Sequence, residues 1–179
     1  MNQDINAFVQ AAIDFGFSKA GGFAVENLKF MPEVREMCNG SCFFYNRNWQ
    51  CPPACAPFDE LKRRAQQFST GLLVQTIGEM EDPFDVETMN DTYKQHEDNF
   101  REFYNKLKAD FPNMLALGAD TCKLCKVCTY PDDPCRMPDK VIAPIESYGL
   151  IVNDICKIAG VDYNYGKLKI AYTGCYLLF

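Results

Sequence analysis

The chain has 179 residues, a formal net charge of −6 and a sequence isoelectric point near 4.8. This length is enough for one domain with its own hydrophobic core, and the acidic balance argues against nucleic-acid binding, which needs a basic surface. The first residues carry no secretory signal, and no apolar run approaches the roughly 18 residues that cross a bilayer, so we expect a cytoplasmic protein without a membrane partner.

The N-terminal part of the chain alternates between helical and extended patterns. Apolar residues recur with helical spacing over residues 5–15, and Gly16 marks the end of this predicted helix. Residues 23–30 predict a strand, and residues 32–37 a helical turn that opens with proline. Residues 38–55 are irregular and rich in cysteine, so we expect a loop there.

The middle of the chain predicts a helix, a strand and a second, longer helix. Residues 59–69 have the first helical pattern, and residues 71–77 form an apolar run with a glycine on each side, typical of a buried strand. An acidic connector over residues 79–91 leads into a charged helix over residues 91–110, whose apolar residues fall on one stripe.

The C-terminal part continues the alternation. We expect a short strand over residues 114–117, a second cysteine-rich loop over 122–135, a helix over 147–159 and a last strand over 168–179. The pattern predicts an α/β fold, with a mixed α+β arrangement also possible. In this fold one compact domain, residues 1–179, holds a sheet of about four strands flanked by helices.

Ten cysteines in a chain without a secretory signal indicate metal binding or redox chemistry more than disulfides. Eight of them lie in the two loops, which we call the first cysteine segment (residues 38–55) and the second cysteine segment (residues 122–135).

The second cysteine segment carries the more specific pattern. Two consecutive two-residue gaps separate Cys122, Cys125 and Cys128, and Cys135 follows six residues later beside prolines. Such tight turns place three thiolates around a [4Fe–4S] cube, with a fourth ligand from further along the chain. A zinc site is the main alternative, although zinc ribbons use two separated cysteine pairs and leave no place for a third cysteine at the same spacing. Disulfides or free thiols remain a third possibility.

The first cysteine segment has wider gaps of three, eight and three residues, which favour an iron–sulfur cluster but are less diagnostic against zinc. Its four candidate ligands are Cys38, Cys42, Cys51 and Cys55. The residues between the two pairs include the aromatics Phe43, Phe44, Tyr45 and Trp49. These rings either shield a cluster from water or belong to the core, and both roles are compatible.

The remaining chemistry-bearing residues predict structural roles. Cys156 lies on a predicted helix and Cys175 on a predicted strand, where lone cysteines are usually small core residues. His96, the only histidine, lies on the charged helix and is expected to be solvated, so we assign no catalytic residue and no Cys–His nucleophile system. No phosphate-binding or dinucleotide-binding glycine motif follows a predicted strand.

Taken together, these motifs resemble the DUF2284 family of predicted metal-binding proteins from anaerobic bacteria and archaea. The resemblance covers about residues 20–179. It rests on the two cysteine patterns, with Pro52 and Pro53 inside the first, and on the runs Leu117-Gly118-Ala119, Cys128-Thr-Tyr-Pro, Cys135-Arg-Met-Pro and Glu146-Ser-Tyr-Gly149. It implies metal binding, with iron–sulfur favoured, and no settled activity. A serine–methionine–glutamate–alanine run usual in the family is replaced here by residues 143–147.

Three hypotheses follow. In the first, the protein transfers electrons through two [4Fe–4S] clusters and docks a redox partner protein. One cluster is held by the first segment and the other by Cys122, Cys125, Cys128 and Cys135, although the fourth cysteine of a run can also serve the other cluster. The second hypothesis is a small reductase whose cluster has one iron without a thiolate. The third is a zinc-stabilised interaction module, in which metal binding supplies folding energy.

Overall fold

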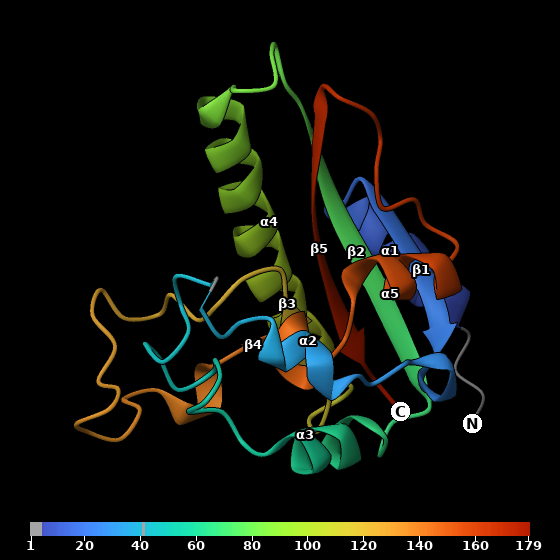
Figure 1. Cartoon of the computed structure of the whole chain (residues 1–179). Helices are drawn as coiled ribbons and strands as arrows, with labels where there is room; N and C mark the ends of the chain where they lie inside the picture. The colour runs from blue at the N-terminus through green and yellow to red at the C-terminus, as the bar shows by residue number, and fades with distance from the viewer. Residues whose placement is uncertain (1–4, 41) are drawn as a thin grey trace.

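The computed structural model describes residues 5–40 and 42–179. Its strands form one mixed sheet in the order β1-β2-β5-β3-β4, flanked by helices (Figure 1). Neighbours are antiparallel except β3 and β4, which are parallel. The predicted mixed α/β fold is thus confirmed, with five strands in the described residues instead of about four. The strands are β1 (Lys19–Ala24), β2 (Thr70–Glu79), β3 (Leu115–Gly118), β4 (Ala143–Pro144) and β5 (Lys169–Leu177).

The helices follow the predicted order; α1 has the predicted bounds and the others have shifted ends. The α-helices are α1 (Ile5–Phe15), α2 (Pro32–Glu36), α3 (Phe58–Ala65), α4 (Val86–Leu107) and α5 (Val152–Ile158). Short 3-10 turns are η1 (Val25–Asn27), η2 (Pro138–Lys140) and η3 (Ile145–Tyr148). Helix α4 begins before the predicted residue 91 because the Asp85 carboxylate accepts the N–H of Thr88 at 3.0 Å and caps the first turn.

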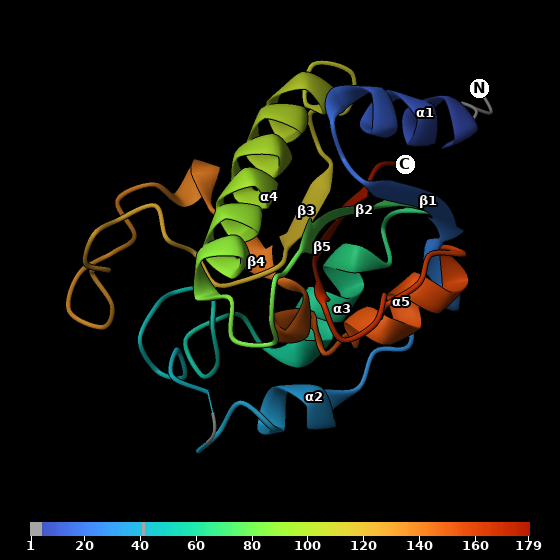
Figure 2. The same cartoon turned by 90° about the horizontal axis from the view of Figure 1, so that it is seen from above.

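The helices cover the sheet on both faces (Figure 2). Helices α1 and α4 pack on one face, where Leu72 and Val74 of β2 meet Phe100 of α4. Helices α3 and α5 pack on the other face, where Leu73 meets a second core. The alternation of neighbouring residues between the two cores is the period of two that a strand imposes. Cys156 and Cys175 are fully buried in the second core, as expected for core residues.

The predicted strand over residues 23–30 is mostly wrong, because only residues 23–24 lie in a strand. The strand lies earlier, at Lys19–Ala24, and η1 follows it. Two glycines, which usually weaken a strand, are needed here because helices pack directly on the backbone. A Cβ on Gly21 would lie 2.2 Å from the carbonyl oxygen of Ala159, and one on Gly22 would lie 2.5 Å from Ile5.

The predicted helix over residues 147–159 is interrupted. Turn η3 ends at Gly149, whose φ of +71° is a left-handed conformation that favours glycine, and α5 begins only at Val152. The N–H of Met31 donates to the carbonyl of Gly149 at 2.8 Å, and a Cβ on Gly149 would lie 2.6 Å from the carbonyl oxygen of Met31. This close contact fixes the start of α2, and with it the entry to the first cysteine segment, against η3.

Candidate metal centre

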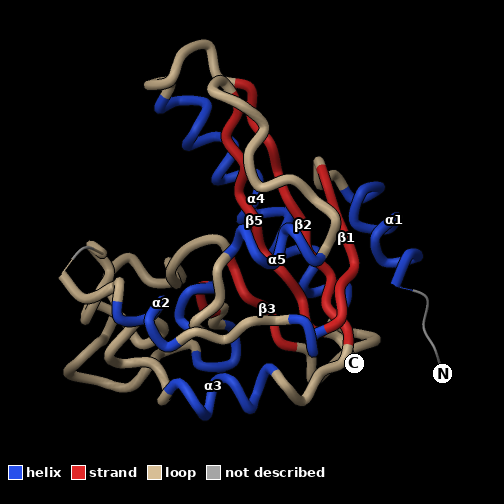
Figure 3. Tube along the Cα trace, turned by 45° about the vertical axis from the view of Figure 1, so that its right-hand side comes forward, coloured by secondary structure: helices blue, strands red, loops and turns tan. Residues whose placement is uncertain are grey.

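The two cysteine segments lie next to each other at one end of the molecule, away from the C-terminus (Figures 1 and 3). The first segment leaves α2 and returns through α3, and the second connects β3 to η2. All ten cysteines lie in the described part of the chain and are free thiols. The fold therefore brings eight thiols from two distant parts of the sequence to one place.

Single turns of backbone bring the first-segment cysteines together in pairs. The N–H of Cys42 donates to the carbonyl of Cys38 at 3.2 Å, and the N–H of Cys55 donates to the carbonyl of Cys51 at 3.0 Å. Gly40, with a φ of +83°, supplies the left-handed residue inside the first pair. Each pair of cysteines is thus linked by one backbone hydrogen bond.

The thiols of this segment also influence one another electrostatically. Burial raises the pKa of Cys38, and Cys42, Cys51, Glu146 and Cys55 add to the rise in that pKa. Because like charges raise a thiol pKa only when they are near, the four cysteines share one neighbourhood.

A positive charge lies at the same place. The guanidinium of Arg35 on α2 donates to Cys55 Sγ at 3.1 Å. Burial raises the pKa of Cys55, and this arginine opposes that rise. Arg35 is therefore placed to stabilise the thiolate form of Cys55.

The second-segment cysteines line a common cavity. Cys122, Cys125, Cys128 and Cys135 all border a space of about 20 Å³. The loop between the last two is closed by Thr129, whose hydroxyl donates to the carbonyl of Pro134 at 2.9 Å. Burial raises the pKa of Cys122, while Arg101 on α4 opposes the rise.

Within residues 5–40 and 42–179, no three histidine, cysteine or acidic side chains are arranged so that they could hold a metal ion. The cysteines of each segment are therefore gathered, but they do not form a coordination geometry. The donor set itself fits a metal: thiolate sulfur is the ligand that zinc and iron–sulfur clusters prefer. Eight free thiols in two groups of four suit two such centres.

The two segments contact each other directly. The indole N–H of Trp49 donates to the carbonyl of Asp133 at 3.2 Å, and its ring meets that of Tyr130 edge-on at 4.9 Å between centroids. Trp49, with Asn48 and Gln50, borders the cavity of the second-segment cysteines. In the other direction, the Thr121 hydroxyl lies 3.0 Å from Cys51 Sγ.

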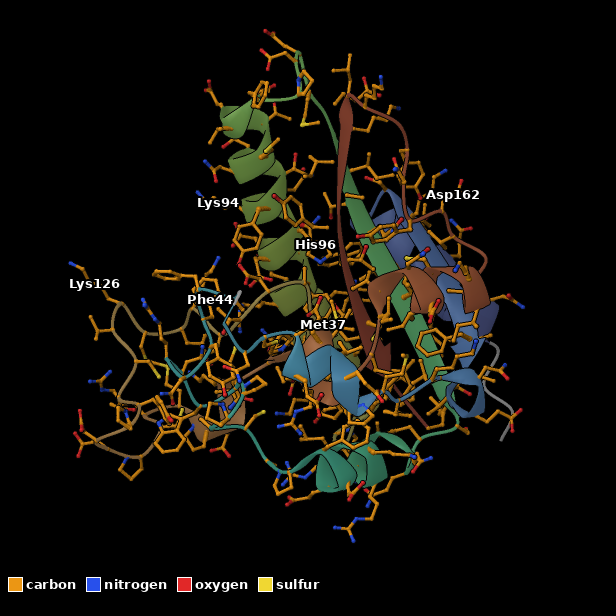
Figure 4. All side chains as sticks on the ribbon, viewed as in Figure 1. Met37, Phe44, Lys94, His96, Lys126 and Asp162 are labelled. Carbon is orange, nitrogen blue, oxygen red and sulfur yellow. The ribbon has the colours of Figure 1, made fainter. Side chains whose placement is uncertain are left out.

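The first segment also borders an open, mainly apolar groove of about 360 Å³. Cys38 and Cys42 line it with Glu146 of η3, and burial raises the pKa of the Glu146 carboxyl. The apolar part of the lining comes from Val34, Met37, Leu150, Ile151, Val152 and Tyr163. Met37 lies at the end of α2, as labelled in Figure 4. This groove gives the first segment a surface open to small molecules that the second segment lacks at its own cavity.

The aromatics between the first-segment pairs do not act as one group. Phe43 is 68% exposed, so it neither shields a cysteine nor belongs to a core. Trp49 does cover cysteines, but they are those of the other segment.

His96 contradicts the expectation of a solvated side chain. It is fully buried between α4 and the sheet, and its Nδ1 lies 3.0 Å from Thr76 Oγ1 (Figure 4). Burial lowers the pKa of His96 to about 4. The charged character of α4 suggested exposure, but His96 falls on the same buried face as Phe100 and Phe103.

Sequence reasoning missed Arg35, Thr121 and Glu146 as neighbours of the cysteines. Arg35 lies three residues before Cys38, Thr121 directly precedes Cys122, and Glu146 opens the run used for the family resemblance. Their closeness in sequence to candidate cysteine ligands was the only signal available for the first two, and spacing alone does not show which thiol each contacts.

No helix in the described ranges is long and apolar enough to cross a membrane. Residues 22–178 match the model of DUF2284, described as a predicted metal-binding protein family. Searches among curated proteins and among solved structures each gave no match.

Proposed function

Because the chain belongs to the DUF2284 family of predicted metal-binding proteins, we propose that its two cysteine segments hold two metal centres that transfer electrons. Each centre is a [4Fe–4S] cluster in this proposal. The observation that supports it most is the gathering of eight free thiols into two adjacent groups of four.

The ligands divide by segment in this proposal. The four second-segment cysteines border one cavity that no first-segment cysteine borders. The other three first-segment cysteines are, in turn, among the main causes of the raised pKa of Cys38. These two observations favour the segment-wise assignment over a crossed one, in which one cysteine serves the other centre.

Iron–sulfur clusters fit the second segment better than zinc does. A cubane needs one thiolate on each of its irons, and the run Cys122, Cys125, Cys128 followed by Cys135 supplies four on one loop. Zinc would use four thiolates as well, but in two separated pairs. When bound, the clusters would supply one-electron redox chemistry, and the chain would hold them, exclude water and set their potentials.

Two centres held by contacting segments suit a relay of single electrons to a redox partner protein. The net charge of −6 fits a partner with a positive docking face.

The test is an absorption spectrum with iron, sulfide and zinc analysis on protein purified without oxygen. We expect a brown protein with about eight irons and about eight sulfides, bleached by dithionite and restored by reoxidation. A colourless protein with stoichiometric zinc and no sulfide would exclude this function and leave the zinc-stabilised interaction module.

A small reductase is the second candidate, favoured by the groove beside Cys38 and Cys42. In this case the first centre has an iron without a thiolate, which faces the groove. Cys42 is exposed and is the first ligand to test. Cys42→Ala would then keep the full iron content, whereas a loss of about half of the iron contradicts the reductase and leaves the electron-transfer role.

A further inference from the structure

The contacts between the two segments are reciprocal. Thr121 belongs to the chain that leads into the second segment, yet its buried hydroxyl lies 3.0 Å from Sγ of Cys51 in the first. Cys51 is itself only 5% exposed. A cysteine that binds a metal is a thiolate without a proton, so the hydroxyl of Thr121 is then the donor in this contact.

Trp49 is the counterpart from the first segment. Its indole borders the cavity of the four second-segment cysteines, and its N–H donates to the carbonyl of Asp133. Tyr130, whose ring it contacts, donates from its hydroxyl to Asn46 Oδ1 at 2.5 Å. Three contacts from the first segment therefore hold the loop between Cys128 and Cys135.

From this exchange we infer that Thr121, directly before the second segment, and Trp49, within the first, are positioning residues, each acting on the metal centre of the other segment. The inference rests on the proposed pair of centres and adds how each is tuned and protected. Thr121 donates to a ligand sulfur of the first centre and stabilises its more negative, reduced state. Trp49 covers the second centre and keeps water from its ligands.

The Thr121 part is tested by potentiometric titration of the holoprotein followed by electron paramagnetic resonance. Cys42→Ser and Cys125→Ser variants first assign the signals of the two centres. Thr121→Val keeps the shape of the side chain but removes the donor, so we expect a lower midpoint potential for the first centre and no shift for the second. Thr121→Ser should restore the wild-type potential. An unchanged first-centre potential in Thr121→Val, or a shift in the second centre alone, would overturn this role.

The Trp49 part is tested by the rate at which a chelator removes metal. Trp49→Ala should release the metal of the second centre several-fold faster while the first centre keeps its wild-type rate. Trp49→Phe keeps a ring over the cavity and should release metal at close to the wild-type rate. Equal rates for wild type and Trp49→Ala, or faster loss from the first centre alone, contradict the inference.

These tests can be carried out whichever metal the purified protein contains. If the purified protein contains zinc, the electron-transfer function fails, but the exchange is still measured by zinc release. Trp49→Ala should then accelerate the release of zinc from the second segment and Thr121→Val from the first. A protein with two zinc ions and unchanged release rates would overturn the exchange by itself.

Discussion

The two cysteine segments hold the same number of candidate ligands but are built in different ways. The first lies between helices α2 and α3, its cysteine pairs are closed by backbone turns, and it borders an open groove of about 360 Å³. The second connects a strand to a short 3-10 turn and closes around a cavity of about 20 Å³.

The spacing of the cysteines and the residues that support them therefore differ between the two segments. The second segment has the tighter cysteine spacing, yet its wall is completed by Asn48, Trp49 and Gln50 of the first. The first segment has the looser spacing but is anchored by Arg35 and by the contact of α2 with η3. Each cysteine motif therefore depends on residues outside it, and these residues come from different parts of the chain in the two segments.

The largest effect should come from removing a ligand of the second segment. Cys125→Ala should lose about half of the bound metal, because the first-segment thiols lie apart from this cavity. Metal and sulfide analysis measures the loss. Cys156→Ala is the matched control: it removes a thiol from the core, costs about 1 kcal/mol of stability and keeps all the metal. Complete loss of metal in Cys125→Ala would show that the two segments form a single site.

Protonation of His96, which is buried between α4 and the sheet, should instead lower the stability of the fold. Because the pKa of His96 falls from 6.5 in the unfolded chain to about 4 in the fold, the folded state binds fewer protons between these pH values. The contribution of His96 to the free energy of unfolding is therefore constant above pH 6.5. It falls by about 3 kcal/mol as the pH decreases to 4.

Denaturant unfolding from pH 7 to 4 measures this loss. The His96→Gln variant keeps a polar partner for Thr76 but cannot take up the proton, so it should lose less stability over the same range. The difference between the two proteins is diagnostic, because Glu97 also titrates: burial raises its pKa and contributes with the opposite sign. Parallel curves for wild type and His96→Gln would contradict the role of His96.

The parts of the fold that follow from local pattern were predictable. The helix over residues 5–15 and the strand that contains residues 71–77 were predicted from apolar spacing alone. The strand β1 was not, because Gly21 and Gly22 are explained only by the helices that pack on them. β4 has two residues and is stabilised by its neighbour β3, so it has no pattern of its own.

The same limit applies to the candidate site. Spacing predicts which cysteines act together within a loop, and this assignment stays a prediction. The partners of each loop come from far away in the chain: Thr121 and Cys51 are separated by 70 positions, and Trp49 and Asp133 by 84. The exposure of His96 was predicted wrongly because the many charged residues of its helix suggested that the whole helix was solvated.

Gly149→Ala should disturb the first segment more than the second. Alanine in a left-handed conformation costs about 1–2 kcal/mol, and its Cβ would lie 2.6 Å from the carbonyl oxygen of Met31, so α2 must move. We expect a loss of about 2 kcal/mol in unfolding free energy and faster release of metal from the first segment. Thermal unfolding and chelator release measure the two effects.

Gly160→Ala is the control, because its φ of +67° is similar but its Cβ meets nothing within 4 Å. Equal metal release in both variants would mean that the position of α2 does not support the first segment.

The smallest effect should follow from removing the charge beside Cys55. Arg35 donates to this thiol at 3.1 Å from a partly exposed position, so the net contribution is discounted to about 1 kcal/mol, roughly fivefold in affinity. Arg35→Met keeps the length of the side chain, and we expect weaker metal retention and a lower potential at the first centre only.

Arg35→Lys keeps the charge but lacks the planar fork of donors, so it should recover part of the effect. Competition with a chelator, read separately for the two centres, measures the difference. An equal effect on the second centre would mean that Arg35 acts through the charge of the whole cysteine end, and the two segments would then be one electrostatic unit.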